Sequence, residues 1–155
     1  MKSRTILVSL AVFFATLAVS LAGDAFVGNW KLNEGKSKFA PDATKNQTVT
    51  YVAAGDDLKV IVDAVDKDSK AIHTEWTGKP DGKDYAVTGA VNEDTRAYTK
   101  VDDKNLDFTS KKGGKVTAQG RVVLSADGKS RTVTTTVTDA NGKKAMSTAV
   151  YDKQP

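Results

Sequence analysis

The shortness of the connections between successive β-type segments limits the fold more than any other feature. After residue 22, apolar and polar residues alternate with a period of two, and helical periodicity is almost absent. Apart from residues 33–46, every connection has four to six residues, which is too short for the crossover that parallel strands require. The expected strands cover residues 26–32, 47–53, 58–65, 71–77, 83–88, 95–101, 106–110, 116–124, 131–138 and 145–151. The chain is therefore predicted to form an antiparallel meander of about ten strands.

A meander of this length has two exposed edges unless it closes on itself. Twist makes such a sheet curl, and closure removes both edges. We therefore expect an all-β fold, an antiparallel up-and-down β-barrel, with a two-sheet sandwich as the alternative. Residues 33–46 contain Pro41 and few apolar residues, and are predicted to be a loop, or at most a short helix, over one end of the barrel.

Residues 1–22 have the pattern of a cleaved signal peptide. Lys2 and Arg4 precede an uncharged stretch over residues 5–21. The small residues Ser20 and Ala22 then stand at the two positions that a signal peptidase reads before a cut after Ala22. A transmembrane anchor is the alternative, because the uncharged stretch has nearly the length of a membrane span. The pattern favours cleavage, a periplasmic or secreted protein and no stable membrane anchor.

The remaining residues, 23–155, are expected to form one domain. The 155-residue chain is 39% hydrophobic and 27% charged, with one histidine and no cysteine. This composition excludes a disulfide scaffold, a thiol nucleophile and a multi-histidine metal site, and we expect no cofactor. The net charge is +4, and the basic residues are scattered along the chain. No concentrated basic face is expected, which argues against nucleic-acid binding.

The two ends of the predicted barrel resemble a known family. Residues 25–32 (AFVGNWKL) are similar to the first strand of the calycin superfamily, and especially to the F-x-G-x-W-K-L of the fatty-acid-binding proteins. Residues 150–153 are similar to the last strand of that family, and the number of strands matches. On one face of the first strand, Gly28 would allow a close backbone approach while Trp30 plugs the barrel floor. The resemblance implies a bacterial, secreted, lipocalin-like domain that binds a small apolar ligand.

Two departures from the family pattern concern the ligand. Residues 33–46 are too few for the pair of helices that these proteins insert after the first strand. In the family, an arginine of the last strand, two residues before a tyrosine, holds the ligand carboxylate. In this chain Ala149 stands at that position, and the tyrosine is kept as Tyr151. Arg131 begins its strand, so its charged head group is expected to reach solvent at the rim of the barrel. Arg121 shares a strand face with the polar residues 115, 117 and 119, and is expected to point to solvent. The sequence therefore predicts an apolar ligand and weak binding of a fatty-acid carboxylate.

Aromatic residues spread over different strands are the candidate ligand-binding residues. In a barrel, inward side chains from many strands converge on one cavity, although they can equally fill the core. The last strand does not decide between a cavity and a filled core, because either of its faces can point inward: the face of small residues with Tyr151, or the face with Met146. The candidates are Trp30, Tyr51, Trp76, Tyr98, Phe108 and Tyr151.

Residues with catalytic potential are few. His73 and Glu75 could act as a general base and its orienting carboxylate, but strand alternation places both opposite Trp76 and hence outside. We expect no catalytic residue, no metal site and no enzymatic activity. The leading hypothesis is a small apolar ligand held in the barrel. The alternative is a non-catalytic envelope or inhibitor protein that acts through its outer surface or loops, and the sequence identifies no protein partner.

Overall fold

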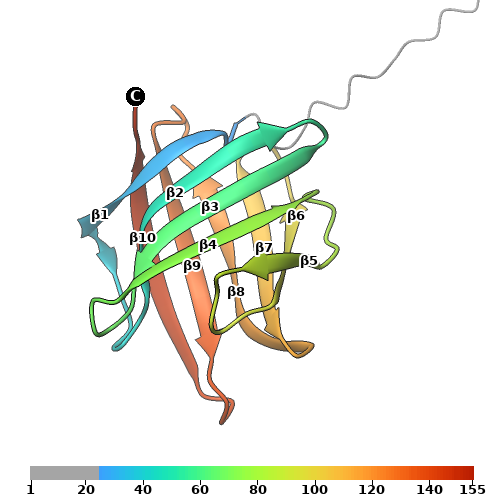
Figure 1. Ribbon diagram of the computed structural model, residues 1–155. Helices are drawn as coiled ribbons and strands as arrows, with labels where there is room; N and C mark the ends of the chain where they lie inside the picture. The colour runs from blue at the N-terminus through green and yellow to red at the C-terminus, as the bar shows by residue number, and fades with distance from the viewer. Residues whose placement is uncertain (1–24) are drawn as a thin grey trace, which may run out of the picture.

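The computed structural model describes residues 25–155 as one closed barrel of antiparallel strands (Figure 1). The predicted signal peptide lies outside the described residues. The part that is described contains no helix, and therefore none long and apolar enough to cross a membrane. The strands are β1 (Gly28–Lys38), β2 (Lys45–Ala54), β3 (Asp57–Val65), β4 (Ala71–Gly78), β5 (Tyr85–Thr88), β6 (Thr95–Lys100), β7 (Asn105–Lys112), β8 (Lys115–Leu124), β9 (Ser130–Thr138) and β10 (Lys144–Lys153).

Consecutive strands pair along the whole chain, and β1 closes the barrel against β10. In the closing seam Leu32 lies opposite Tyr151, and Lys38 lies opposite Thr148. Strands β2 to β4 cross in front of β8 to β10 in Figure 1, as in a barrel with tilted strands. The meander and its closure are confirmed, and the sandwich is excluded.

The first connection differs from the prediction. β1 continues to Lys38 because the register against β10 shifts between Asn33 and Lys38. The Ser37 hydroxyl accepts a hydrogen bond from the Val150 N–H at 2.9 Å, and this holds the displaced part of β1 in place. The loop predicted over residues 33–46 therefore shrinks to residues 39–44, and no helix covers the barrel end.

One end of the barrel is packed with side chains. Trp30 is fully buried there, and its Nε1–H donates to the Phe26 carbonyl at 2.9 Å. Gly28 has φ +135, and a Cβ at this position would lie 2.7 Å from Lys153 Cε. The tryptophan plug predicted for the first strand is present, whereas the group that comes close to Gly28 is the Lys153 side chain and not the backbone that was predicted. Other large residues of this packed end are Leu58, Val60, Trp76, Leu106, Val122 and Leu124.

The small face of β10 points into the barrel. Ala149 and Tyr151 are buried, whereas Met146 is 65% exposed on the outside. The choice that the sequence left open is thereby settled. Inward alanine and serine side chains on β10 leave the half of the barrel above the packed end unfilled.

Candidate ligand-binding cavity

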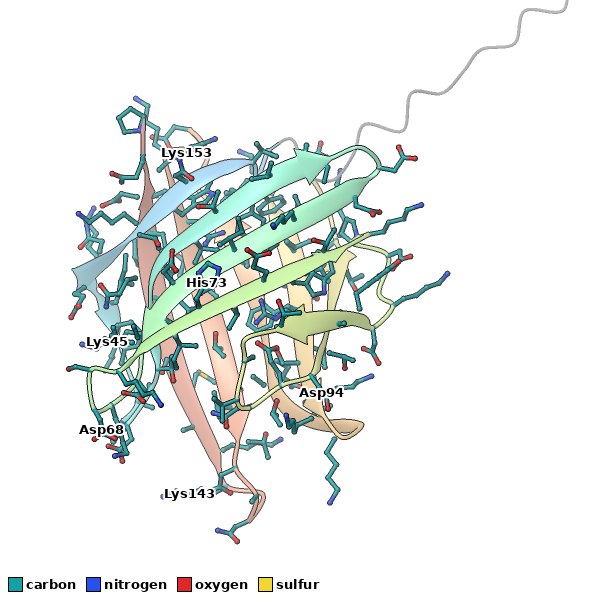
Figure 2. All side chains as sticks on the ribbon, viewed as in Figure 1. Lys45, Asp68, His73, Asp94, Lys143 and Lys153 are labelled. Atoms are coloured by element: carbon teal, nitrogen blue, oxygen red, sulfur yellow. The ribbon has the colours of Figure 1, made fainter. Side chains whose placement is uncertain are left out.

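The unfilled half of the barrel is a cavity of about 1010 Å³. This volume is at the upper end of the range for small-molecule sites, roughly 300–1,000 Å³. The cavity is bordered by the loops at residues 39–44, 89–94 and 139–143. Figure 2 shows Asp94 and Lys143 at this open end, and Lys153 at the packed end. The apolar wall comes mainly from β2, β3, β9 and β10, and consists of Val49, Val62, Ala64, Val133 and Ala149.

A buried arginine lies where the cavity meets the packed end. Arg131 is only 2% exposed, and its guanidinium carbon lies 4.9 Å from the ring centre of Trp30. The rings of Tyr51 and Tyr151 lie 4.7 Å and 4.8 Å from the same carbon. Three aromatic faces thus surround one cation, an arrangement stabilised by cation–π attraction.

The position of Arg131 corrects the prediction that it would reach solvent at the rim. Arg131 lies opposite Tyr151 in the β9–β10 register, and both point inward. Trp30 and Phe26 seal this end of the barrel, so the long side chain lies over the tryptophan instead of passing outward. Arg121 is on the outside as expected, where it forms an ion pair with Asp107 at 2.5 Å.

Burial also raises the pKa of two tyrosines that line the cavity. Burial raises the pKa of Tyr151 to about 12, with Arg131 acting in the opposite direction and Tyr51 adding to the rise. Burial likewise raises the pKa of Tyr98 well above its usual range. Both hydroxyls are therefore protonated at neutral pH and can donate hydrogen bonds to a ligand.

A second arginine of the cavity already has a counterion. Arg96 on β6 forms a bidentate ion pair with Glu93, in which Nε–H donates to Oε2 at 3.1 Å and Nη2–H donates to Oε1. Its Nη1–H also donates to the Tyr98 hydroxyl at 3.2 Å. Burial alone would lower the pKa of Arg96, but Tyr98 and Glu93 together raise it above its ordinary value. This ion pair is self-contained and ties the β5–β6 loop to the barrel wall.

The structure brings the six predicted aromatic residues together but gives them different positions. Tyr51, Tyr98, Phe108 and Tyr151 line the cavity. Trp30 and Trp76 lie in the core beneath it, and the Trp76 ring packs 4.8 Å from that of Tyr98. The tryptophans thus support the floor that the other aromatic residues present to the cavity.

Sequence reasoning missed the polar side chains on the inner face. Thr74 and Ser110 are buried and line the cavity, and neither was a candidate. Strand alternation does carry the signal, because Thr74 shares a face with Trp76, and Ser110 with Phe108. Arg131 was visible in the same way, since it shares a face with Val133.

His73 and Glu75 lie on the outer surface, as predicted, and Figure 2 shows His73 there. His73 is 57% exposed; its Nδ1 lies 2.6 Å from Asp63 and its Nε2 lies 3.4 Å from Glu75. Glu75 also pairs with Lys59 at 2.8 Å. The hydrogen bond with Asp63, and then that with Glu75, raises the pKa of His73 above its ordinary value. Within residues 25–155, no three histidine or acidic side chains are placed to hold a metal ion.

Sequence comparison yields no relative, whereas structure comparison does. No known protein family matches the chain, and no curated protein is similar to it in sequence. A redesigned β-barrel, mFAP1, bound to DFHBI, superposes with a TM-score of 0.50 at 16% identity, covering 86% of this chain and 100% of that one. The zebrafish ileal bile acid-binding protein complexed with cholic acid superposes with a TM-score of 0.50 at 15% identity, covering 84% and 99%.

The barrel has the same overall fold as these two proteins, a closed barrel that here consists of ten antiparallel strands. At this level of identity the likeness concerns the fold alone, which agrees with the resemblance at the two ends of the chain.

Proposed function

We propose that this protein binds a small, largely apolar molecule inside the barrel. The observation that carries the proposal is the cavity of about 1010 Å³ above an aromatic floor. A filled interior would instead favour action through the outer surface or loops. Two neighbours of the same fold are seen with small molecules, cholic acid and DFHBI, which supports the same reading.

We further propose binding without catalysis. The only histidine lies on the outer face with its carboxylate partners, on the opposite side of β4 from the cavity-lining Thr74. A general base must reach the group from which it takes a proton, and His73 cannot reach a ligand in the cavity from there.

The proposed location is periplasmic or extracellular, and it rests on the pattern of residues 1–22 alone. Intact-mass measurement of the protein recovered from its host tests this proposal. A mature chain that begins at Gly23 or Phe26 supports it, and retention of residues 1–22 contradicts it.

Displacement of Nile red, a neutral fluorescent probe, tests the binding function. Ala64 and Ala149 are buried and line the cavity, so Ala149→Phe and Ala64→Phe each place a ring in the space that the probe would occupy. Val123→Phe is the matched control, because Val123 is exposed on the outside of β8.

The wild type and Val123→Phe should bind Nile red, and dodecanol should displace it. Each inward variant that keeps the wild-type circular dichroism spectrum should bind at least about tenfold more weakly, a loss of about 1.4 kcal/mol. Equal binding by all variants would place the probe outside the barrel. A folded wild type that binds neither compound would overturn the proposal.

A further inference from the structure

The guanidinium of Arg131 is buried without an anionic partner. Its Nε and Nη1 are both buried and lack a hydrogen-bond acceptor among the residues that the structure describes. The aromatic rings of Trp30, Tyr51 and Tyr151 attract its positive charge, but their faces neither neutralise that charge nor replace strong acceptors. A buried cation in this condition is costly unless something else pairs with it.

Other charges around the cavity do not meet this need. Glu93, a cavity-lining carboxylate, is bound by Arg96. The cavity-lining residues Asp42 and Asp139 belong to the loops at the open end, and Asp139 accepts hydrogen bonds from its own turn. In the described part of the chain, the deep end of the cavity therefore holds a single cation without a counterion.

Arg131 also faces the space that a ligand would occupy, since it is one of the residues that line the cavity. The planar guanidinium matches a carboxylate, which can accept two hydrogen bonds from it. The protonated Tyr151 hydroxyl belongs to the neighbouring strand in register with Arg131. The wall formed by β2, β3, β9 and β10 is mainly apolar, and the mouth of the cavity lies at the end opposite Arg131.

We propose that Arg131 is the anchor for a carboxylate, and that the ligand is an amphipathic monoanion bound with its charged group deep in the barrel and its apolar body toward the mouth. This inference rests on the proposed binding function. It places the anchor on β9, one strand away from the β10 position where the resemblance puts the family's arginine and this chain has Ala149. One free cation at the deep end implies one anionic group there, because the charge of Arg96 is already matched by Glu93, and the cavity-lining Lys112 and Lys115 are exposed beside the β7–β8 turn.

Matched chains that differ only in their head group test the inference. Dodecanoate, dodecanol and methyl dodecanoate are used to displace Nile red from the wild type, Arg131→Met and Arg121→Met. Arg121→Met is the control, because it removes one positive charge from the outer surface, where Arg121 pairs with Asp107. Arg131→Lys is included because it keeps the charge but loses the planar fork.

The wild type and Arg121→Met should bind dodecanoate at least about tenfold tighter than dodecanol. Arg131→Met should bind the two compounds within about twofold of each other, with dodecanol affinity retained, and Arg131→Lys should keep part of the preference. If Arg131→Met fails to fold, the inference is still tested by the wild-type preference for dodecanoate over dodecanol and by the reduction of that preference in Arg131→Lys.

Two results would overturn the inference. One is a wild type that binds dodecanol as tightly as dodecanoate, and the other is an Arg131→Met protein that keeps the full preference. In both cases the proposed function survives, because the chains still bind. A wild type that binds none of the three compounds removes the proposed function itself.

Discussion

At the scale of single residues, Arg131 shows what alternation can and cannot predict. Its inward face follows from the pattern that it shares with Val133 on β9. Whether a long cationic side chain at the end of a strand turns out to solvent or stays inside the barrel depends on the packing around it. Here Trp30 and Phe26 occupy the route to solvent, and these residues belong to β1 and the segment before it, about 100 positions earlier in the chain. No local pattern contains that information.

His73 gives a prediction for the pH dependence of stability. Asp63 and Glu75 raise its pKa in the folded state, so its stabilising contribution is complete below the unfolded value of about 6.5 and disappears as the pH rises through the folded value. His73→Gln should therefore lower the melting temperature more at about pH 5.5 than at about pH 9. The effect should be small, because the cluster is exposed and Lys59 also lies beside Glu75.

Asp63→Asn is the companion variant, since it removes the main cause of the pKa shift. Its melting temperature should deviate from the wild type mainly at the lower pH. An equal deficit for His73→Gln at both pH values would show that the residue acts through packing and not through charge. His73→Ala should bind the cavity probe within about twofold of the wild type, since the side chain points outward.

At the scale of strands, the hairpins were predictable and their irregularities were not. Glycines at 55, 113, 128 and 142 take positive φ values, as expected from the turn signals in the sequence. The extension of β1 to Lys38 depends on a register shift against β10, its partner at the other end of the chain. A single strand's pattern does not encode such a shift, because the shift is a property of the pair.

β5 is expected to be the strand that opens most readily. It pairs with β4 at two positions and with β6 at two positions, whereas β9 and β10 pair at nine. In hydrogen exchange followed by mass spectrometry, residues 85–88 should exchange well before residues 130–138. Protection of β5 equal to that of β9 would contradict this account of the barrel.

The Glu93–Arg96 ion pair should restrain the same region, because it joins the β5–β6 loop to β6. Glu93→Gln is expected to speed exchange over residues 85–94. Glu34→Gln is the control, since it alters an exposed ion pair with Lys45 on another part of the barrel and should leave that exchange unchanged.

At the scale of the whole molecule, the central claim is that a ligand enters the barrel. Its direct test is a titration of the methyl NMR spectrum with dodecanol, whose binding does not depend on the charge of Arg131. Val49, Val62, Val133 and Ala149 line the cavity, whereas Val52, Val101 and Val123 are exposed outside it. The account predicts saturable shifts of the first group while the second group stays in place. Shifts confined to the outer valines, or no shifts in a folded protein, would contradict it.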